Sequence, residues 1–487
     1  MTKTVLLSIK KNRSLSEQLR DRGYYLPAWC GGRGLCGKCR VRFCGKAPKA
    51  GRQDEAFFTE QELKEGFRLA CSVYAEGTYE ILMEDLQEEK IEAADLFYGS
   101  GEASDTACRA LAIDIGTTTI AASLLDTKKK HVIKTVTGIN HQRVFGADVL
   151  SRIDAANRGE GKKLQEMVLS DMSSLCRELG AGSQVTGLDI PVVISGNTTM
   201  EHLLQGLSCE SLGVYPFTPV DISLHTFKNM TILPGISTFL GADIVSGMIA
   251  CDMDRKDEIS ILVDLGTNGE MLIGNRHKIL AASAAAGPAF EGGNITHGMA
   301  GIPGAIDTVL MKEDHVRVTT IGGETPAGIC GSGVIETLYE LKKEKMIDET
   351  GLLGKAYFDK GYPLAPDIIF TQRDIRMVQM AKSAIRAGIE ILLDAYGVNY
   401  DRIDRLYLAG GFGQKINCAK AVGIGMLPEE LAGRITPIGN SSLEGAVLYA
   451  MNQAPAERFT KAAEISEEIS LSEHDLFNDL YMKYMFL

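Results

Sequence analysis

Short apolar runs that end in polar, glycine-containing turns are the main pattern in residues 109–487. The first run, LAIDIGTTT at 111–119, leads from an apolar stretch into Asp, Gly and three Thr residues. A second run, ISILVDLGTNGEMLIG at 259–274, repeats this order 150 residues later. Runs of this kind are typical of buried strands. Two copies separated by the length of a domain predict a two-lobed protein.

Both turns have the composition of a phosphate-binding loop. Gly116 permits a tight turn, after which main-chain amides and Thr hydroxyls could point at a phosphate. Asp114 ends the strand and would then hold a magnesium ion or its water shell. Asp264, Gly266 and Thr267 repeat Asp114, Gly116 and Thr117 in the second turn. One such turn alone is also typical of an ordinary Asx turn, so the repeat is what favours a nucleotide between two lobes.

Three later segments are further candidates for lining this cleft. AAAGPAFEGG at 284–293 is too rich in glycine for a helix interior, and its Glu291 could position a water molecule, although a solvated loop glutamate is the alternative. GICGSG, which contains Gly331, precedes an expected helix whose N-terminus could approach phosphate. The strand at 403–409 runs into Gly410 and Gly411, where a flat base or ribose would meet no side chain.

The first 85 residues have a different pattern. Alternating segments at 4–9 and 78–83 predict strands, and a capping box that begins at Thr59 predicts a short helix. Between them lies LPAWCGGRGLCGKC, with the spacing C-x5-C-x2-C, followed by a distant fourth cysteine. The four candidate iron ligands are Cys30, Cys36, Cys39 and Cys71.

Three thiolates on a glycine-rich loop and a distant fourth are the plan of a [2Fe–2S] ferredoxin. The glycines would let main-chain amides approach the sulfurs. Zinc is the alternative, but zinc loops usually supply two C-x2-C pairs and only one is present here. Trp29, the only tryptophan, is expected to fill the core beside the loop.

Composition adds limits on location and partners. The 487 residues carry a net charge of −12, although residues 1–50 alone carry +10. No aromatic–basic interleaving accompanies that positive charge, so a nucleic-acid partner is not expected. No apolar run is long enough to span a membrane. Eleven cysteines without a signal-like start indicate a reducing cytoplasm and use of some cysteines for metal binding.

The repeated turns and LAGGFG, in this order, resemble the two phosphate motifs and the adenosine motif of the acetate kinase, sugar kinase, Hsp70 and actin superfamily. The resemblance implies that Asp114 and Asp264 manage Mg²⁺ and water. It also implies that Gly410, Gly411 and Phe412 border adenosine. The implied phosphate-binding residues are Gly116, Thr117, Thr118, Gly266, Thr267 and Asn268.

Taken together, the two halves resemble the reductive activators of corrinoid proteins. The implied fold is α/β and multidomain. It comprises a β-grasp [2Fe–2S] ferredoxin domain at 1–85, an acidic linker at 86–108, and a ribonuclease H-like ATPase of the actin/Hsp70 superfamily, with lobes at 109–258 and 259–487. The implied cofactors are the cluster, ATP and Mg²⁺. The expected partners are a corrinoid protein and a low-potential electron donor, and a homodimer is a possible assembly.

The resemblance implies that one electron passes from the cluster to cobalt(II) and regenerates cobalt(I). A plant-type [2Fe–2S] centre has a potential of about −400 mV, and the cobalt couple lies lower, so ATP would have to drive the transfer. Three alternatives stay open at this point. They are an electron-donating ATPase for another target, a small-molecule kinase with an accessory metal domain, and a nucleotide switch with a zinc domain.

Overall fold

The computed structural model describes residues 2–84, 108–312, 315–410 and 416–487. The N-terminal part folds around a four-stranded sheet of order β1-β4-β2-β3. Its elements are β1 (Thr2–Ile9), α1 (Leu15–Arg20), β2 (Arg40–Cys44), α2 (Arg52–Phe57), α3 (Glu60–Lys64), β3 (Phe67–Leu69) and β4 (Gly77–Glu84). The predicted capping box is confirmed, because the Thr59 hydroxyl accepts from the Glu62 amide and the Glu62 carboxylate accepts from the Thr59 amide.

The first lobe contains a six-stranded sheet of order β7-β6-β5-β8-β10-β9. Strand β5 lies antiparallel to β6 and parallel to β8. Helices α5 and α6 pack on one face of this sheet around an apolar core. The elements are β5 (Arg109–Ile115), β6 (Thr119–Asp126), β7 (His131–Ile139), α4 (Val149–Ala155), α5 (Gly161–Glu178), β8 (Val192–Gly196), α6 (Thr198–Gln205), β9 (His225–Phe227), β10 (Met230–Ile232) and α7 (Ala242–Ala250).

The second lobe repeats this plan with a sheet of order β20-β19-β11-β12-β13-β21. Strand β11 lies antiparallel to β12 and parallel to β19, as β5 does to β6 and β8. Its first elements are β11 (Ile259–Asp264), β12 (Glu270–Asn275), β13 (Lys278–Ser283), β14 (Ala305–Lys312), β15 (His315–Thr320), β16 (Gly328–Ile329), α8 (Gly331–Lys343), β17 (Tyr362–Ala365) and β18 (Ile368–Phe370). The rest are α9 (Gln372–Tyr396), β19 (Ile403–Ala409), α10 (Cys418–Gly423), β20 (Ile435–Gly439), α11 (Ser441–Ala450), α12 (Ala456–Glu464), β21 (Ser466–Glu468) and α13 (Phe477–Met485).

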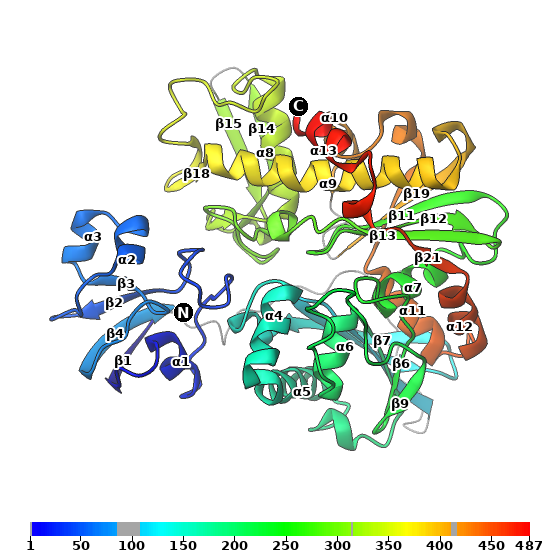
Figure 1. Cartoon of the computed structure of the whole chain (residues 1–487), viewed down its shortest axis with the longest axis horizontal. Helices are drawn as coiled ribbons and strands as arrows, with labels where there is room; N and C mark the ends of the chain where they lie inside the picture. Colours follow the sequence, from blue (N-terminus) through cyan, green and yellow to red (C-terminus); the bar gives the residue numbers. More distant parts are fainter. Residues whose placement is uncertain (1, 85–107, 313–314, 411–415) are drawn as a thin grey trace.

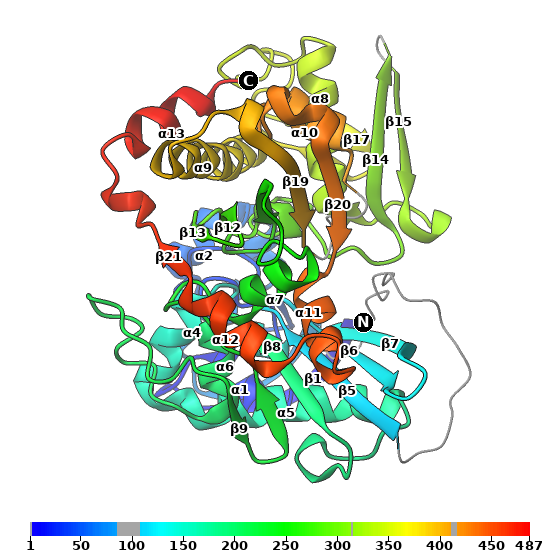
Figure 2. The same ribbon diagram turned by 90° about the vertical axis from the view of Figure 1, so that its right-hand side faces the viewer.

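Helices α7 and α11 form a layer between the two sheets (Figure 2). Their apolar side chains share one core with Ala112 of β5 and Leu262 of β11. Although α11 follows the second sheet in sequence, it packs against β5 and β8 of the first. The chain segment 259–487 therefore contributes a helix to the first lobe, and the ends of the two central strands lie close to each other.

The predicted α/β architecture, with a separate N-terminal domain followed by two lobes of similar plan, is confirmed. Helix α13 packs along α9 (Figure 1), so the C-terminal segment covers an edge of the second lobe. Residues 86–107 of the predicted acidic linker lie outside the described residues, as do Gly411 and Phe412. Among the residues that the structure describes, no helix is long and apolar enough to cross a membrane.

Candidate functional site

The two aspartates that the repeat singled out end the central strands of the two sheets. Asp114 is the penultimate residue of strand β5 and Asp264 is the last residue of β11. Both side chains are only partly exposed. Burial, together with the neighbouring charges of Asp243, Asp114 and Glu291, raises the pKa of Asp264 to about 8. The two predicted carboxylates are therefore close enough for the charge of one to affect the pKa of the other. They lie where the two lobes meet, a region called the seam below.

Asp114 is held in place by the start of helix α11. The Asn440 amide donates to one carboxylate oxygen at 2.8 Å, and the Ser442 hydroxyl donates to the other at 2.6 Å. Burial raises the pKa of Asp114, and these two hydrogen bonds oppose that rise. The segment GNSSLEGA at 439–446 therefore has a role that the sequence did not reveal. It orients the first aspartate from a position more than 300 residues away.

Glu291 joins the two phosphate-type turns. It ends a 3₁₀ turn (Pro288–Glu291), and its Oε2 accepts from the Thr118 hydroxyl at 2.6 Å and from the Thr267 hydroxyl at 2.7 Å. Thr118 lies between β5 and β6, and Thr267 lies between β11 and β12. Glu291 is therefore not a solvated loop residue. One carboxylate oxygen connects the two lobes at the point where the predicted phosphate motifs face each other.

Two further carboxylates at this seam were missed by the sequence analysis. Burial raises the pKa of Asp243, at the start of α7, to about 7, and it raises the pKa of Glu270 well above its usual value. Asn268 donates to Glu270 at 2.9 Å. The signal for Asp243 was available, because Gly241 and Asp243 open an apolar helix. A Cβ at Gly241 would lie 2.5 Å from the Thr198 amide nitrogen, so that glycine permits close packing of α7.

Carboxylate oxygens are the donors that Mg²⁺ prefers, and Mg²⁺ usually takes only one or two carboxylates together with waters and substrate phosphates. Within the described ranges, no group of three or more His, Cys, Asp or Glu side chains is arranged to hold an ion unaided. Asp114 and Asp264 supply two such carboxylates, one from each lobe.

The remaining predicted nucleotide residues surround these carboxylates. Gly116 and Thr117 lie in the first turn, and Asn197 donates to the Thr117 hydroxyl at 3.1 Å. Gly266 lies in the second turn, and Gly410 follows strand β19 directly. Gly331 opens helix α8, where a Cβ would lie 1.7 Å from the Phe290 carbonyl oxygen. Only glycine therefore fits where α8 meets the 3₁₀ turn that carries Glu291.

The four predicted iron ligands form two pairs. Cys39 and Cys71 approach to 3.3 Å between their sulfurs. The Cys36 side chain is hydrogen-bonded to Cys30 and lowers the pKa of the Cys30 thiol to about 4. The hydrogen bond with Cys71 likewise lowers the pKa of Cys39. A two-iron cluster takes two thiolates at each iron, so the pairing fits a [2Fe–2S] cluster better than one tetrahedral zinc ion.

The loop at 26–39 that carries Cys30, Cys36 and Cys39, called the cluster loop below, also provides main-chain hydrogen-bond donors. The Leu35 amide donates to the Cys30 sulfur at 3.4 Å. Gly37 has a φ of +69°, and a Cβ there would lie 2.4 Å from the Phe57 ring. Glycine at this position lets the loop turn sharply and pack on helix α2. Such amide–sulfur contacts tune the potential of an iron–sulfur centre.

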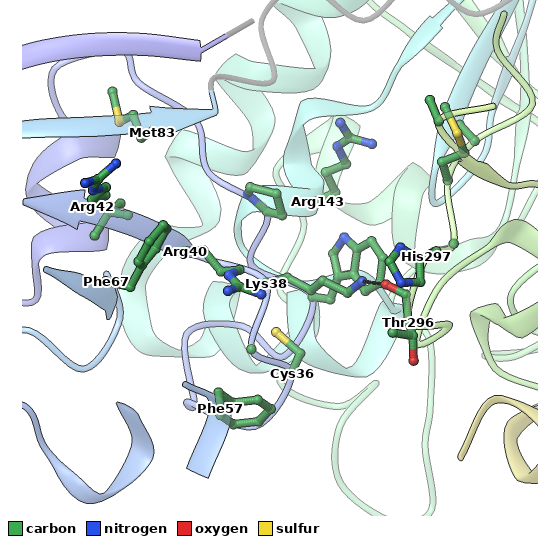
Figure 3. Close-up of a pocket in the computed structure, with 18 of the residues that line it drawn as sticks. Cys36, Lys38, Arg40, Arg42, Phe57, Phe67, Met83, Arg143, Thr296 and His297 are labelled. Atoms are coloured by element: carbon green, nitrogen blue, oxygen red, sulfur yellow. Dashed lines mark hydrogen bonds between the residues drawn. The ribbon is translucent and has the colours of Figure 1, made fainter. Parts of the chain in front are cut away.

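The same loop contacts both lobes of the second part of the chain. On the first lobe, the Ala147 amide donates to the Trp29 carbonyl at 3.2 Å, and Arg33 donates to the Ser151 hydroxyl at 3.1 Å. On the second, the Lys38 ammonium donates to the carbonyls of Ile295 and Thr296 at 3.1 and 3.2 Å. Figure 3 shows Lys38 reaching toward Thr296.

Trp29 lies at this junction rather than in the ferredoxin core. It is half-buried, and the Lys38 ammonium lies 4.5 Å from its ring centre. The expectation of a core position was therefore wrong, because no local sequence pattern indicates that the loop docks on the lobes.

Comparison with known families matches three successive parts of the chain. Residues 2–76 match the 2Fe-2S iron-sulfur cluster binding domain. Residues 109–256 match the RACo middle region, and residues 258–487 match the C-terminal domain of RACo, the ASKHA domain.

Whole-chain relatives carry related descriptions. The chain is 31% identical to the corrinoid activation enzyme RamQ of Eubacterium limosum, over 76% of this chain and 69% of that one. It is 25% identical to the Co(II) methylated amine-specific corrinoid protein reductase of Methanosarcina barkeri, over 76% of each. A solved structure, titled reductive activator for corrinoid, iron-sulfur protein, aligns over 99% of this chain and 96% of its own, with a TM-score of 0.71 and 26% identity.

Proposed function

Because this chain belongs to the family of corrinoid activation enzymes that includes RACo and RamQ, we propose that it reactivates a corrinoid protein by ATP-dependent reduction of cobalt(II) to cobalt(I). The observation that carries the proposal is the direct contact between the cysteine loop and both nucleotide-type lobes in one chain. A kinase with an accessory metal domain would not need this contact. An electron-transfer protein that is controlled by a nucleotide would need such a contact between its two sites.

Cys30, Cys36, Cys39 and Cys71 are proposed to hold the iron–sulfur cluster. The bound cluster would supply a carrier for one electron. The thiolates of Cys39 and Cys71 are buried, with 2% and 6% exposure, so the protein keeps water away from that side. A low-potential donor is required as the source of the electron. A homodimer is compatible with this proposal, because each chain contains both the cysteine site and the nucleotide site and needs no residue from a partner.

The seam between the lobes is proposed to bind Mg²⁺ and ATP. Asp114 and Asp264 would orient the ion or its waters, and the turns that follow them would hold the phosphates through main-chain amides. Glu291 would position the attacking water, since its carboxylate already reaches both turns. By family resemblance, the segment 410–412 would border adenosine.

A short connection is proposed to couple the two sites. Phosphates bound between the turns would compete with Glu291 for the hydroxyls of Thr118 and Thr267. Four to five residues after Glu291, the carbonyls of residues 295–296 accept from Lys38 beside the cluster. Displacement of Glu291 would therefore be transmitted to the contact that fixes the cluster loop. Because this loop is attached to both lobes, a change in their angle cannot preserve both attachments.

The proposal can be tested with the corrinoid subunit of an anaerobic O-demethylase, prepared in the cobalt(II) state. The dithionite-reduced full chain is mixed with this subunit without nucleotide, with MgATP, with MgADP and with a non-hydrolysable ATP analogue. Cobalt(I), followed by its optical spectrum, is expected only with MgATP. Equal cobalt(I) formation in all four mixtures would overturn the ATP requirement, and phosphorylation of a metabolite would favour a kinase.

A further inference from the structure

A deep cleft separates the ferredoxin-like part from the two lobes. Its volume is about 730 Å³, and all three parts of the chain line it. Figure 3 shows Cys36, Lys38 and Arg40 on one side and Arg143, Thr296 and His297 on the other. A cavity of this size accommodates a ligand or a protruding segment of a partner. This cleft is separate from the proposed nucleotide site, because Asp114, Asp264 and Glu291 do not line it.

The lining of the cleft is strongly cationic. Its charged members are Lys38, Arg40, Arg42, Arg143 and Arg373, with His297 beside them, and no Asp or Glu lines it within the described part of the chain. Arg42 donates to the Glu65 carbonyl, and Lys38 also donates to carbonyls, so these bonds add no negative charge. Arg40 pairs with Glu62 at 2.6 Å. In a chain of net charge −12, this concentration of positive charge needs an explanation.

The cleft also reaches the more accessible pair of cluster ligands. Cys36 and Gly37 form part of its wall. Cys36 is half-buried, whereas Cys39 and Cys71 are 2% and 6% exposed. A redox partner seated in the cleft would therefore approach the Cys30–Cys36 pair rather than the buried Cys39–Cys71 pair.

The geometry points to this cleft as the docking site for the acidic face of a small one-electron carrier protein that reduces the cluster. This inference rests on the proposed function. One electron leaves the carrier, which is oxidised, and enters the cluster, which is reduced from the 2+ to the 1+ state. No proton or group is transferred.

A protein occupant is favoured over a small anion by where the charges lie. Arg40, Arg42 and Arg373 are exposed at the mouth of the cleft rather than folded onto an enclosed pocket. Charges at the rim of an interface act mainly by steering a macromolecular partner of opposite charge, and they raise association rates by about 10- to 1,000-fold at low salt.

The test uses charge reversal at matched positions. The cleft variant combines Arg42→Glu and Arg373→Glu. The control combines Arg52→Glu and Lys355→Glu, which are exposed, lie outside the cleft and change the net charge equally. Each full-length protein is mixed anaerobically with a reduced acidic bacterial ferredoxin, and bleaching of the cluster is followed by stopped flow. Binding of the oxidised ferredoxin is titrated separately. Reduced methyl viologen, a cation, serves as a second electron donor.

The cleft variant is expected to be reduced by ferredoxin at least about 10-fold more slowly at low salt, with weaker binding and a flatter salt dependence. The control should stay within about twofold of the wild type, and methyl viologen should reduce all three proteins equally fast. Equal losses in both variants, or none, would overturn the proposal. So would fast, saturable reduction by reduced flavin mononucleotide that depends on the same two arginines, since a small anion would then be the occupant. The assay contains neither ATP nor a corrinoid, so its failure would leave the proposed function standing.

Discussion

Replacing Glu291 by glutamine is expected to tighten nucleotide binding while slowing hydrolysis. In the structure, one oxygen of Glu291 accepts short hydrogen bonds from Thr118 and Thr267, at 2.6 and 2.7 Å. These are the hydroxyls that phosphates are proposed to use. An incoming phosphate must therefore break both bonds and approach a negative carboxylate.

The magnitude follows from the type of bond. A hydrogen bond to a charged group contributes about 1.5–3 kcal/mol net, and one between neutral groups about 0.5–1.5 kcal/mol. Exchanging two charge-assisted bonds for neutral ones should weaken the link between Glu291 and the two Thr hydroxyls by about 2 kcal/mol, which corresponds to about 30-fold tighter binding of a non-hydrolysable ATP analogue. Phosphate release should fall about 100-fold, because the amide cannot accept a proton from water.

The assay is an equilibrium titration with the analogue beside a phosphate-release measurement on the same preparation. Glu324→Gln, an exposed residue of the same lobe, is the matched control and should change neither quantity. If Glu291→Gln weakened binding and turnover together, the carboxylate would be a structural support. Turnover at the wild-type rate would refute its role in positioning water.

Further predictions concern the two sites, their connection and the C-terminal helix. Asp264→Ala should abolish ATP-driven cobalt reduction but keep the iron content, whereas Cys71→Ser should lose the cluster and keep nucleotide binding; iron analysis and nucleotide titration check both. Lys38→Met should weaken docking of the cluster loop by about 1–2 kcal/mol, seen as faster hydrogen exchange in the loop. Burial raises the pKa of Glu390, but hydrogen bonds from Tyr484 and Tyr400 and the charge of Arg386 lower it below 4.5 overall. The stabilising contribution of Glu390 is therefore complete above pH 4.5 and is lost as the pH falls through its lower, folded-state pKa. Helix α13 should therefore become sensitive to protease in acid. The Tyr484→Phe variant should show the same sensitivity at neutral pH.

The repeated pattern was sufficient to predict the two lobes, since each copy contains a whole strand–turn–strand unit. Asp114 and Asp264 could be identified because each follows an apolar strand directly. The residues that hydrogen-bond to Asp114 could not be identified from the sequence. Asn440 and Ser442 act on Asp114 only because α11 returns to the first sheet, and no local pattern records that packing.

Glu291 shows the same limit in another form. Its glycine-rich surroundings correctly excluded a helix interior, but they did not show that the 3₁₀ turn places its carboxylate between two turns from different lobes. Trp29 lies beside a loop whose cysteine spacing was informative, yet its surroundings depend on docking between domains. The spacing of residues within one segment predicts which chemical groups a site contains. Contacts between distant segments depend on how complete domains pack, so the spacing does not predict them.

In the proposed function, an electron from the cysteine-bound cluster reaches cobalt when ATP is present. The most direct measurement is freeze-quench EPR of the reduced protein mixed with the cobalt(II) corrinoid subunit, before and after addition of MgATP. The proposed function predicts that the signals of the reduced cluster and of cobalt(II) disappear together, one for one, and only after MgATP is added. Loss of the cobalt(II) signal while the cluster signal persists, or equal loss without nucleotide, would contradict it.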